Sequence, residues 1–353
     1  MNNPDQTTDL SIDNLSRFDD IIDVRSPAEF EEDHLPGAIS LPVLNNDERA
    51  EVGRTYVQDS RFLARRMGAA LVSKNVSEHL TTALSDKPAK YRPLIYCWRG
   101  GMRSNAMATI LSAIGWRTSV VSGGYRTWRR QVVEALIDDR SPLKILIIDG
   151  QTGAAKTDIL NRAADFGVQT LDLEALALHR GSVFGGHHDR KQPKQKLFES
   201  LIWERISQFD PARPILIEAE SNRIGQCFVP ARLWRSMLAA PRVEIRAAAD
   251  VRARHLVGAY EDMIDNPDVL QAAIHRLRTY HSKAMLDTWH SMARDRAFEP
   301  LALSLIEEHY DAVYNRTRRT SRDAPGDRIE LEDLQVDDLS AAASQIADIA
   351  GRS

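Results

Sequence analysis

Cysteine is scarce in this sequence: only Cys97 and Cys227 occur among 353 residues. Two cysteines are too few for a disulfide framework, and this count fits a reducing compartment. The first residues, MNNPDQTTDLSIDN, lack the basic-then-apolar pattern of a secretory signal. No segment approaches the ~18 consecutive apolar residues of a membrane-spanning helix. The sequence therefore predicts a cytoplasmic protein without a membrane partner.

An excess of positive charge is also lacking, since the formal net charge is −4. This charge argues against a protein that coats nucleic acid non-specifically. Basic residues do gather at 179–196 and at 316–322 (RTRRTSR), and such runs are about as often solvated surface as phosphate contacts. Hydrophobic residues make up 43% and charged residues 27%, which is typical of a globular chain long enough for two domains.

Strand-like and helix-like segments alternate over residues 15–138, which we interpret as the first domain. Short apolar runs at 20–24, 93–97 and 118–122 predict buried strands. Helical patterns occupy 28–35, 47–84 and 105–115, and Ser104 is the expected N-cap of the last of these helices. Strands that alternate with helices indicate an α/β fold with a mostly parallel sheet.

A second α/β block begins after the polar linker at 138–142. Its most apolar strand is LKILIID at 143–149, and further strands are expected at 214–220 and 243–248. The pattern after about residue 250 is helical and charged. We therefore expect a domain at 139–320 with a helical C-terminal part, and a polar C-terminal tail at 321–353 that contains one weak helix.

Cys97 stands at the carboxyl end of a predicted buried strand, in the segment LIYCWRGGMRSNAM. The loop after it carries Arg99 and Arg103 and leads into a helix N-terminus, so positive charge and backbone N–H groups should face the sulfur. Each of these favours the thiolate, which lowers the pKa of Cys97 and makes it nucleophilic. The glycine pair Gly100-Gly101 would let the backbone curl around the sulfur. Cys227 lacks such surroundings and is interpreted as an inert core residue.

The apolar run at 143–149 leads into GQTGAAKT and then into a predicted helix. This is the arrangement of a P-loop, in which backbone N–H groups surround a diphosphate, a lysine reaches the phosphates and a hydroxyl can hold Mg²⁺. Ala155 replaces the usual glycine before the lysine, so its methyl group should crowd the phosphate site, and vigorous ATP hydrolysis is not expected. The predicted phosphate-binding residues are Gly150, Thr152, Gly153, Lys156 and Thr157.

Two further segments gather polar groups among turn residues, at 172–186 and at 217–225 (IEAESNRIG). Taken alone, each is more often a surface loop than a site. The pair His187-His188 is a weak metal signal because no carboxylate or cysteine completes a ligand set at a recognisable spacing. We therefore predict no metal site and no tightly bound cofactor.

Four landmarks of the first block stand in a characteristic order: DVRSPAEF at 23–30, HLPGA at 34–38, the Cys97 loop, and GGYR at 123–126. With these landmarks the block resembles a rhodanese domain. The resemblance implies that Cys97 accepts a chalcogen atom and passes it on. Related phosphatases share the fold but have a longer loop, and the short loop from Cys97 to Arg103 suits a sulfur-sized cargo better than a phosphate ester.

Over about residues 15–320 the chain resembles the bacterial tRNA 2-selenouridine synthase family. The motifs that carry this resemblance are CWRGGMRS, GGYRTWR, GQTGAAKT, DLEALALHRGS, QPKQKLFE and IEAESNRIG. Several of them are specific to that family and are not shared by rhodaneses or P-loop proteins at large. Ala155 is the visible departure from its pattern.

The resemblance implies an enzyme that replaces the sulfur of wobble 2-thiouridine in tRNA by selenium from selenophosphate, which selenophosphate synthetase would supply. Family enzymes also transfer a geranyl group from geranyl diphosphate to that sulfur, and an S-alkyl thiol is the better leaving group. Cys97 would carry the selenium as a selenylsulfide, and the P-loop would hold the diphosphate. Candidate contacts to tRNA or donor are Glu174, Arg180, Glu220, Ser221, Arg223 and the basic run at 316–322.

Three alternatives have distinct signatures. A generic persulfide sulfurtransferase with a nucleotide-binding domain would turn over thiosulfate and cyanide without tRNA. A small-molecule kinase or ATPase with an inactive rhodanese module would be favoured by an absent loop cysteine, but Cys97 is present. A non-catalytic tRNA-binding adaptor would keep its function when Cys97 is replaced by serine.

Overall fold

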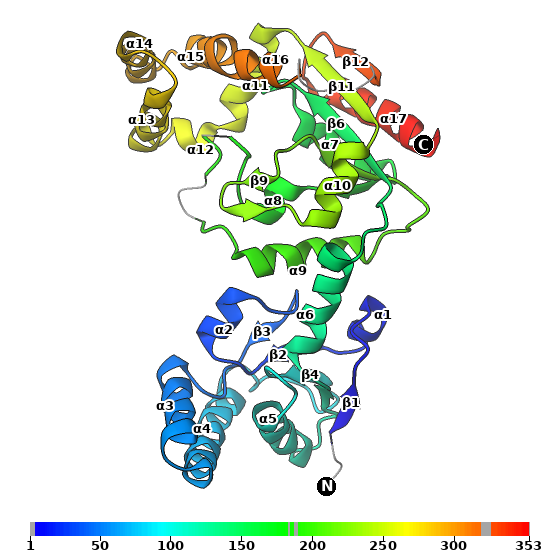
Figure 1. Ribbon diagram of the computed structural model, residues 1–353, viewed down its shortest axis with the longest axis vertical. Helices are drawn as coiled ribbons and strands as arrows, with labels where there is room; N and C mark the ends of the chain where they lie inside the picture. Colours follow the sequence, from blue (N-terminus) through cyan, green and yellow to red (C-terminus); the bar gives the residue numbers. More distant parts are fainter. Residues whose placement is uncertain (1–3, 183, 187–189, 319–325, 353) are drawn as a thin grey trace. The chain divides into compact units, whose positions relative to one another are not determined.

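The computed structural model describes residues 4–182, 184–186, 190–318 and 326–352. The chain forms two compact units: the first comprises Met1–Asp139 and Pro193–Glu204, and the second comprises Arg140–Gln192 and Arg205–Ser353. Both units are α/β with parallel sheets, which confirms the predicted fold class (Figure 1). Among the helices of the described residues, none combines the length and the apolar character that crossing a membrane requires.

The first unit is built on a five-stranded parallel sheet with the strand order β1-β5-β4-β2-β3. Every residue of β4 is buried, as expected for a parallel strand that is covered on both faces. β1 precedes residue 15, so the unit begins earlier than the predicted domain boundary. The strands are β1 (Asp5–Thr7), β2 (Asp20–Asp23), β3 (Ile39–Ser40), β4 (Pro93–Tyr96) and β5 (Ser119–Val121).

The helices of the first unit differ from the prediction at two points. The segment 47–84 forms two helices, because Ser60 accepts a hydrogen bond from the backbone N–H of Leu63 and so starts a second helix. Ser104 as an N-cap is wrong: its helix begins at Met102, with Gly101 at the N-cap position. The helices are α1 (Ile12–Leu15), α2 (Pro27–Glu32), α3 (Asn46–Gln58), α4 (Arg61–Thr81), α5 (Met102–Ala113), α6 (Tyr125–Val133), the π-helix η1 (Glu134–Asp138) and α9 (Gln195–Ile206).

Residues Pro193–Glu204 group with the first unit, although the sequence places them in the second domain. The Trp128 Nε1–H on α6 donates to Ser200 Oγ over 3.0 Å, and Arg129 forms an ion pair with Glu199. Each of these contacts joins positions about seventy residues apart in the chain. A local sequence pattern therefore could not predict this assignment.

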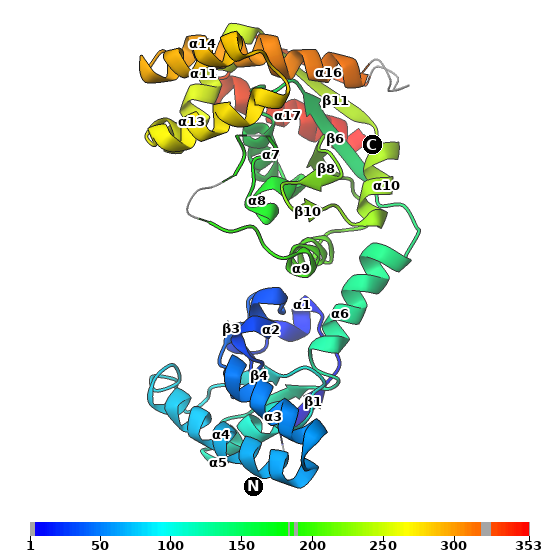
Figure 2. The ribbon, with the colours of Figure 1, turned by 60° about the vertical axis from the view of Figure 1, so that its left-hand side comes forward.

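The second unit contains a five-stranded parallel sheet with the order β12-β11-β6-β8-β7 and an antiparallel pair, β9 and β10 (Figure 2). The helices between residues 261 and 305 pack around a core of their own that includes Ile274 and Trp289. The strands are β6 (Ile145–Gly150), β7 (Gln169–Leu171), β8 (Ile215–Glu218), β9 (Arg223–Ile224), β10 (Cys227–Phe228), β11 (Arg242–Ala247) and β12 (Asp327–Leu331).

Most helices of the second unit follow β11, in agreement with the helical part that the sequence predicts. The helices are α7 (Lys156–Asp165), α8 (Leu173–Ala177), α10 (Ala231–Ala239), α11 (Ala249–Ala259), α12 (Glu261–Ile264), α13 (Pro267–Arg276), the 3₁₀ turn η2 (Leu277–Thr279), α14 (Lys283–Arg294), α15 (Phe298–Leu305), the π-helix η3 (Ile306–Tyr310), α16 (Asp311–Arg318) and α17 (Val336–Arg352).

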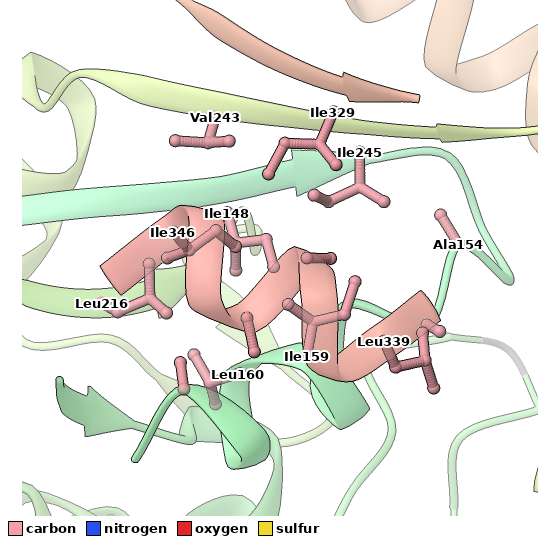
Figure 3. Packing of buried hydrophobic residues seen from close by; sticks show 14 of the residues in the cluster. Ile148, Ala154, Ile159, Leu160, Leu216, Val243, Ile245, Ile329, Leu339 and Ile346 are labelled. Atoms are coloured by element: carbon pink, nitrogen blue, oxygen red, sulfur yellow. The ribbon is translucent and has the colours of Figure 1, made fainter. Parts of the chain in front are cut away.

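The predicted polar tail at 321–353 is wrong for the residues that the structure describes. β12 pairs with β11 along its whole length and completes the sheet. α17 packs against α7, and Leu339 and Ile346 lie in the same buried cluster as Ile159 and Leu160 (Figure 3). Burial of each large apolar side chain contributes roughly 1.5–3 kcal/mol. The C-terminal segment is therefore part of the core of the P-loop unit.

Candidate functional site

Cys97 follows β4 directly, and its side chain is only 3% exposed. Its Sγ accepts hydrogen bonds from the backbone N–H of Gly101 and from the Ser104 hydroxyl, both over 3.2 Å. Gly101 is the N-cap residue of α5 and Ser104 lies in its first turn. The donors at the start of this helix therefore converge on the sulfur, as the loop sequence predicts.

Hydrogen bonds and charge decide the ionisation of Cys97. Burial by itself raises the pKa of the thiol, but hydrogen bonds from Ser104 and from the backbone N–H of Arg99 lower it, as does the charge of Arg103. The net result is a pKa of Cys97 below the ordinary thiol value. Burial without such donors raises the pKa of Cys227. The two cysteines therefore differ in the direction that the sequence predicts.

The two loop arginines have different surroundings. Arg103 forms a salt bridge with Glu29, with 2.7 Å between Nη1 and Oε2. Glu29 also accepts from the backbone N–H of Ser26 as part of the capping box of α2. Arg99 has an exposed side chain. Sequence reasoning missed Glu29 as a neighbour of the site, since its local pattern indicates only a helix start, and it assigned Ser104 to a helix cap without predicting its contact with the sulfur.

Close backbone packing explains one glycine of the loop and not the other. A Cβ atom on Gly100 would lie 2.5 Å from the carbonyl oxygen of Val121, and one on Gly124 would lie 2.1 Å from that of Cys97. Gly101 has open space around it, so the expectation that both loop glycines are needed for room is wrong for Gly101. The backbone of the Cys97 loop is therefore in close contact with the turn that contains Gly124.

The other landmarks of the first block support the Cys97 loop. Tyr125 donates its backbone N–H to the Cys97 carbonyl oxygen over 2.8 Å and its hydroxyl to Asp33 over 2.7 Å. The guanidinium of Arg25 lies 4.1 Å from the ring centroid of Tyr125 and is also paired with the Asp23 carboxylate. These buried contacts fix the backbone on which the sulfur is carried.

Replacing Ser104 with alanine is expected to raise the pKa of Cys97. The thiolate loses one hydrogen bond, and a hydrogen bond to a charged group is worth about 1.5–3 kcal/mol, or about 1–2 pKa units. The measurement is the rate of iodoacetamide alkylation as a function of pH, with Cys227→Ala as background. Ser112→Ala, on the same helix, serves as the control. An unchanged midpoint in Ser104→Ala would show that this hydroxyl does not stabilise the thiolate.

The P-loop of the second unit runs from the end of β6 to the start of α7. Lys156 is the first residue of α7, and its Nζ donates to the Gly150 carbonyl oxygen over 3.0 Å. A Cβ atom on Gly150 would lie 2.6 Å from the carbonyl oxygen of Ile245, so glycine is required there. Ala155 has a φ of 55° and thus keeps the left-handed conformation that a glycine would adopt, at a cost of about 1–2 kcal/mol.

A buried arginine stabilises the backbone of the P-loop. Arg252 on α11 donates to the carbonyl oxygen of Thr152 over 3.0 Å and forms a bidentate pair with Asp311, at 3.0 and 2.8 Å. Planar bidentate pairs of this kind fix orientation as well as charge. Sequence reasoning missed Arg252, because nothing in its local pattern signals a contact one hundred residues away.

A cavity of about 880 Å³ lies against the P-loop in the second unit. Its wall also includes α8, the turn after it, the end of β8, and residues of α11 such as His255 and Leu256. The predicted site residues that line this cavity are Gly150, Thr152, Gly153, Lys156, Thr157, Glu174, Arg180 and Glu220. Two segments that the sequence could only describe as polar loops therefore contribute to one site.

Ser221 and Arg223 do not line the cavity. The Ser221 hydroxyl donates to the Arg223 carbonyl oxygen over 2.6 Å, and Arg223 Nε donates to the carbonyl oxygen of Gly225. These are local contacts of a turn, and they give neither residue a part in the site. Positions 187–188 and 319–322 lie outside the described residues, as do the side chains at 316–318.

Three carboxyl groups of this cavity have raised pKa values. Burial, together with repulsion from Glu220 and Glu218, raises the pKa of Glu174 to about 9. Burial likewise raises the pKa of Glu218 to about 7 and raises that of Glu220, while Lys156 opposes the shift in all three. Glu174 and Glu220 are hydrogen-bonded to each other, so this pair holds a proton near neutral pH. The cavity therefore combines the ammonium group of Lys156 with carboxyl groups that ionise less readily than usual.

An apolar cavity adjoins the large one within the second unit. The two share Thr152, Leu256, Tyr260 and Tyr310 as lining residues. The rest of the apolar wall comes from Phe184 and from α11, α12, α13 and α15, with side chains such as Met263 and Leu301. The charged groups at the P-loop therefore lie next to an apolar cavity of about 80 Å³.

Two family models match the chain. The rhodanese-like domain matches residues 7–131, and the tRNA 2-selenouridine synthase AAA domain matches residues 143–273. The first matched segment contains Cys97 and its loop, and the second contains the P-loop and the three carboxyl groups.

Relatives that carry one shared name, tRNA 2-selenouridine synthase, match both halves. The protein of Hahella chejuensis is 31% identical over 83% of this chain and 84% of its own length. The protein of Chromohalobacter salexigens is 30% identical over 88% of this chain and 77% of its own length. The protein of Psychromonas ingrahamii is 34% identical over 68% of this chain and 64% of its own length, which is less than two thirds of that relative.

Proposed function

This chain belongs to the tRNA 2-selenouridine synthase family, and from that membership we propose that it replaces the sulfur of wobble 2-thiouridine in tRNA by selenium. Selenophosphate is the proposed donor, and a selenophosphate synthetase is its proposed source. Cys97 is the proposed selenium carrier. The observation that supports this role is a buried thiol with converging donors and a lowered pKa, since the thiolate is the nucleophilic form.

We further propose that the second unit binds geranyl diphosphate and alkylates the sulfur before selenium replaces it. The observation that carries this proposal is the shared wall of the two cavities. The diphosphate would lie on the P-loop and Lys156, where backbone N–H groups and a cation meet negative charge. The geranyl chain would extend past Leu256 and Tyr260 into the apolar cavity. Burial of that chain would contribute most of the affinity.

Mg²⁺ remains a proposed partner of the diphosphate. Thr157 occupies the P-loop position whose hydroxyl meets Mg²⁺, and it is hydrogen-bonded to the carboxyl group of Glu218. The diphosphate itself would supply the other oxygen ligands, which suits the hard, oxygen-preferring ion. When bound, the ion would neutralise charge on the leaving diphosphate.

The test of the proposed function is reconstitution with purified protein. A tRNA that carries 2-thiouridine at the wobble position is incubated with geranyl diphosphate and then with selenophosphate, and its nucleosides are analysed by mass spectrometry. We expect S-geranyl-2-thiouridine after the first addition and 2-selenouridine after the second. Turnover of thiosulfate and cyanide without any change in the tRNA would instead identify a generic sulfurtransferase and would refute the proposal.

A further inference from the structure

The loop that follows Cys97 exposes two apolar side chains. Trp98 is 39% exposed and Met102 is 66% exposed, although Cys97 itself is only 3% exposed. Single exposed apolar residues are common on protein surfaces. These two, however, flank a buried nucleophile, at the place where the reaction partner of Cys97 must arrive.

The ring of Trp98 is exposed and yet held in place. Its centroid lies 5.1 Å from that of the Tyr125 ring, and the guanidinium carbon of Arg25 lies 5.9 Å from it. The Trp98 carbonyl oxygen accepts a hydrogen bond from the backbone N–H of Arg126 over 3.3 Å. A ring that is fixed in this way can bind a ligand with little further loss of conformational entropy.

Gly101 leaves free space beside the sulfur. Its backbone N–H donates to the Cys97 Sγ over 3.2 Å, so this glycine lies against the reacting atom. Its φ is −99°, outside the left-handed region that favours glycine, and a Cβ atom there would have no neighbour within 4 Å. Packing inside the protein therefore does not account for a glycine at this position, whereas the close approach of a substrate to the sulfur would.

Two arginines border the same surface. Arg99 and Arg126 are both exposed, and neither forms an ion pair within the part of the chain that the structure describes. Cations that lack an acidic partner suit the phosphate oxygens of a nucleic acid. We call the surface formed by Trp98, Arg99, Gly101, Met102 and Arg126 the loop face.

We propose that the loop face binds the wobble nucleotide of the tRNA in its S-geranylated form, extruded from the anticodon loop. This inference rests on the proposed function of the chain. The pyrimidine stacks on the indole of Trp98, and the flexible side chain of Met102 packs against the geranyl chain. Arg99 and Arg126 bind the phosphates on either side of the extruded base.

Size and charge favour a nucleotide over a protein partner at the loop face. A stable protein–protein interface buries about 800 Å² on each partner. Two apolar side chains and two arginines instead match one base, its apolar substituent and the neighbouring phosphates. Extrusion of a base gives an active site access to atoms that stacking covers. The free space at Gly101 then lets C2 of the base approach the chalcogen atom on Cys97.

The test is single-turnover conversion of tRNA that carries S-geranyl-2-thiouridine into 2-selenouridine, with selenophosphate and an excess of the full-length protein. Met102→Ala should raise the half-saturating protein concentration roughly 5–50-fold, because three heavy atoms lose contact with the geranyl chain. Trp98→Leu should raise it about 5–100-fold through lost stacking, and Trp98→Phe should restore most of the affinity. Gly101→Ala should lower the rate at saturation about 10²-fold, as for a misplacement of about 1 Å.

The arginines are tested through the salt dependence of the same reaction. Arg99→Gln and Arg126→Gln should each reduce the slope of log affinity against log salt by about 1. Ile114→Ala, at the other end of α5, and Arg117→Gln are matched controls with exposed side chains in the same unit, and both should behave as wild type. Alkylation of Cys97 by iodoacetamide should keep its wild-type pH dependence in Met102→Ala and Gly101→Ala, which excludes a distorted loop.

Three outcomes separate this inference from the proposed function. Failure of the wild type to form S-geranyl-2-thiouridine and 2-selenouridine would refute the proposed function itself. Normal conversion by the wild type, with unchanged half-saturation in Met102→Ala and Trp98→Leu, would overturn only the inference. A defect of these variants that appears only when selenophosphate synthetase supplies the donor, and not with free selenophosphate, would also overturn it, because the loop face would then bind a protein.

Discussion

Replacing Cys97 with serine is expected to abolish the formation of 2-selenouridine while S-geranyl-2-thiouridine persists or accumulates. The hydroxyl group is held by the same donors as the thiol, from Gly101 and Ser104, but it does not ionise near neutral pH and does not carry a heavier chalcogen. In the proposed function the geranyl transfer takes place in the P-loop unit, which the substitution does not change. Loss of 2-selenouridine should exceed about a thousandfold, as for the removal of other catalytic nucleophiles.

The measurement is mass analysis of wobble nucleosides from cells that lack the gene and are complemented with each variant. Cys227→Ala is the matched control: Cys227 is also buried, but burial raises the pKa of its thiol. Cys227→Ala should support wild-type levels of 2-selenouridine. Unchanged 2-selenouridine in the Cys97→Ser strain would show that no selenium is carried at this position. Simultaneous loss of the geranylated nucleoside would show instead that the two steps share this thiol.

The cysteine loop was predictable because its physics is local. The strand, the glycines, the arginines and the helix start lie within about ten residues, so the sequence indicated an anionic sulfur at Cys97. The sequence predicted that Ser104 is the N-cap of α5, and this prediction was wrong. Its hydroxyl lies 3.2 Å from both the Cys97 Sγ and the carbonyl oxygen of Gly101, and the N-cap position belongs to Gly101 because α5 already begins at Met102. Proximity in sequence located the residue, and only the fold showed what it contacts.

The helix in the C-terminal segment was predicted and is confirmed by α17, but the place of this segment in the core was not predictable from its composition. β12 has one buried residue, Ile329, between charged neighbours, and it becomes a strand only by pairing with β11. The buried residues of α17 are mainly alanines such as Ala342 and Ala343. Alanine contributes little to a hydrophobic pattern in the sequence, but its small side chain lets the helix approach α7 closely. Pairing and close approach are tertiary effects, and they override weak local patterns.

In the candidate site, the cavity beside the P-loop likewise depends on tertiary contacts that the local sequence does not reveal. The segment 217–225 carries several polar residues close together, and the sequence could not rank Glu220 above Ser221 or Arg223. The structure separates them because β8 lies next to β6, so the residues at its carboxyl end face the phosphate loop. For Glu218 the useful signal is the strand order, which no single segment contains.

Replacing Lys156 with alanine is expected to remove S-geranyl-2-thiouridine and, if the thioether precedes selenation, 2-selenouridine as well. The ammonium group stands at the phosphate loop and is the cation that opposes the raised pKa values of Glu174, Glu218 and Glu220. Without it the diphosphate loses its counter-charge and the carboxyl groups become harder to ionise. Removal of one such preorganised donor costs about 10²–10³ in rate.

The combination of the two variants distinguishes the order of steps. Cys97→Ser should leave the geranylated nucleoside, whereas Lys156→Ala should leave unmodified 2-thiouridine, and Lys283→Ala at the start of α14 is the control for a lost surface charge. The nucleosides are quantified by mass spectrometry, and geranyl diphosphate affinity is measured in parallel by calorimetry. If Lys156→Ala keeps the geranylated nucleoside, the diphosphate does not bind at the P-loop. If it loses that nucleoside but keeps 2-selenouridine, selenation does not require the thioether. Cys97 would then transfer selenium directly to 2-thiouridine.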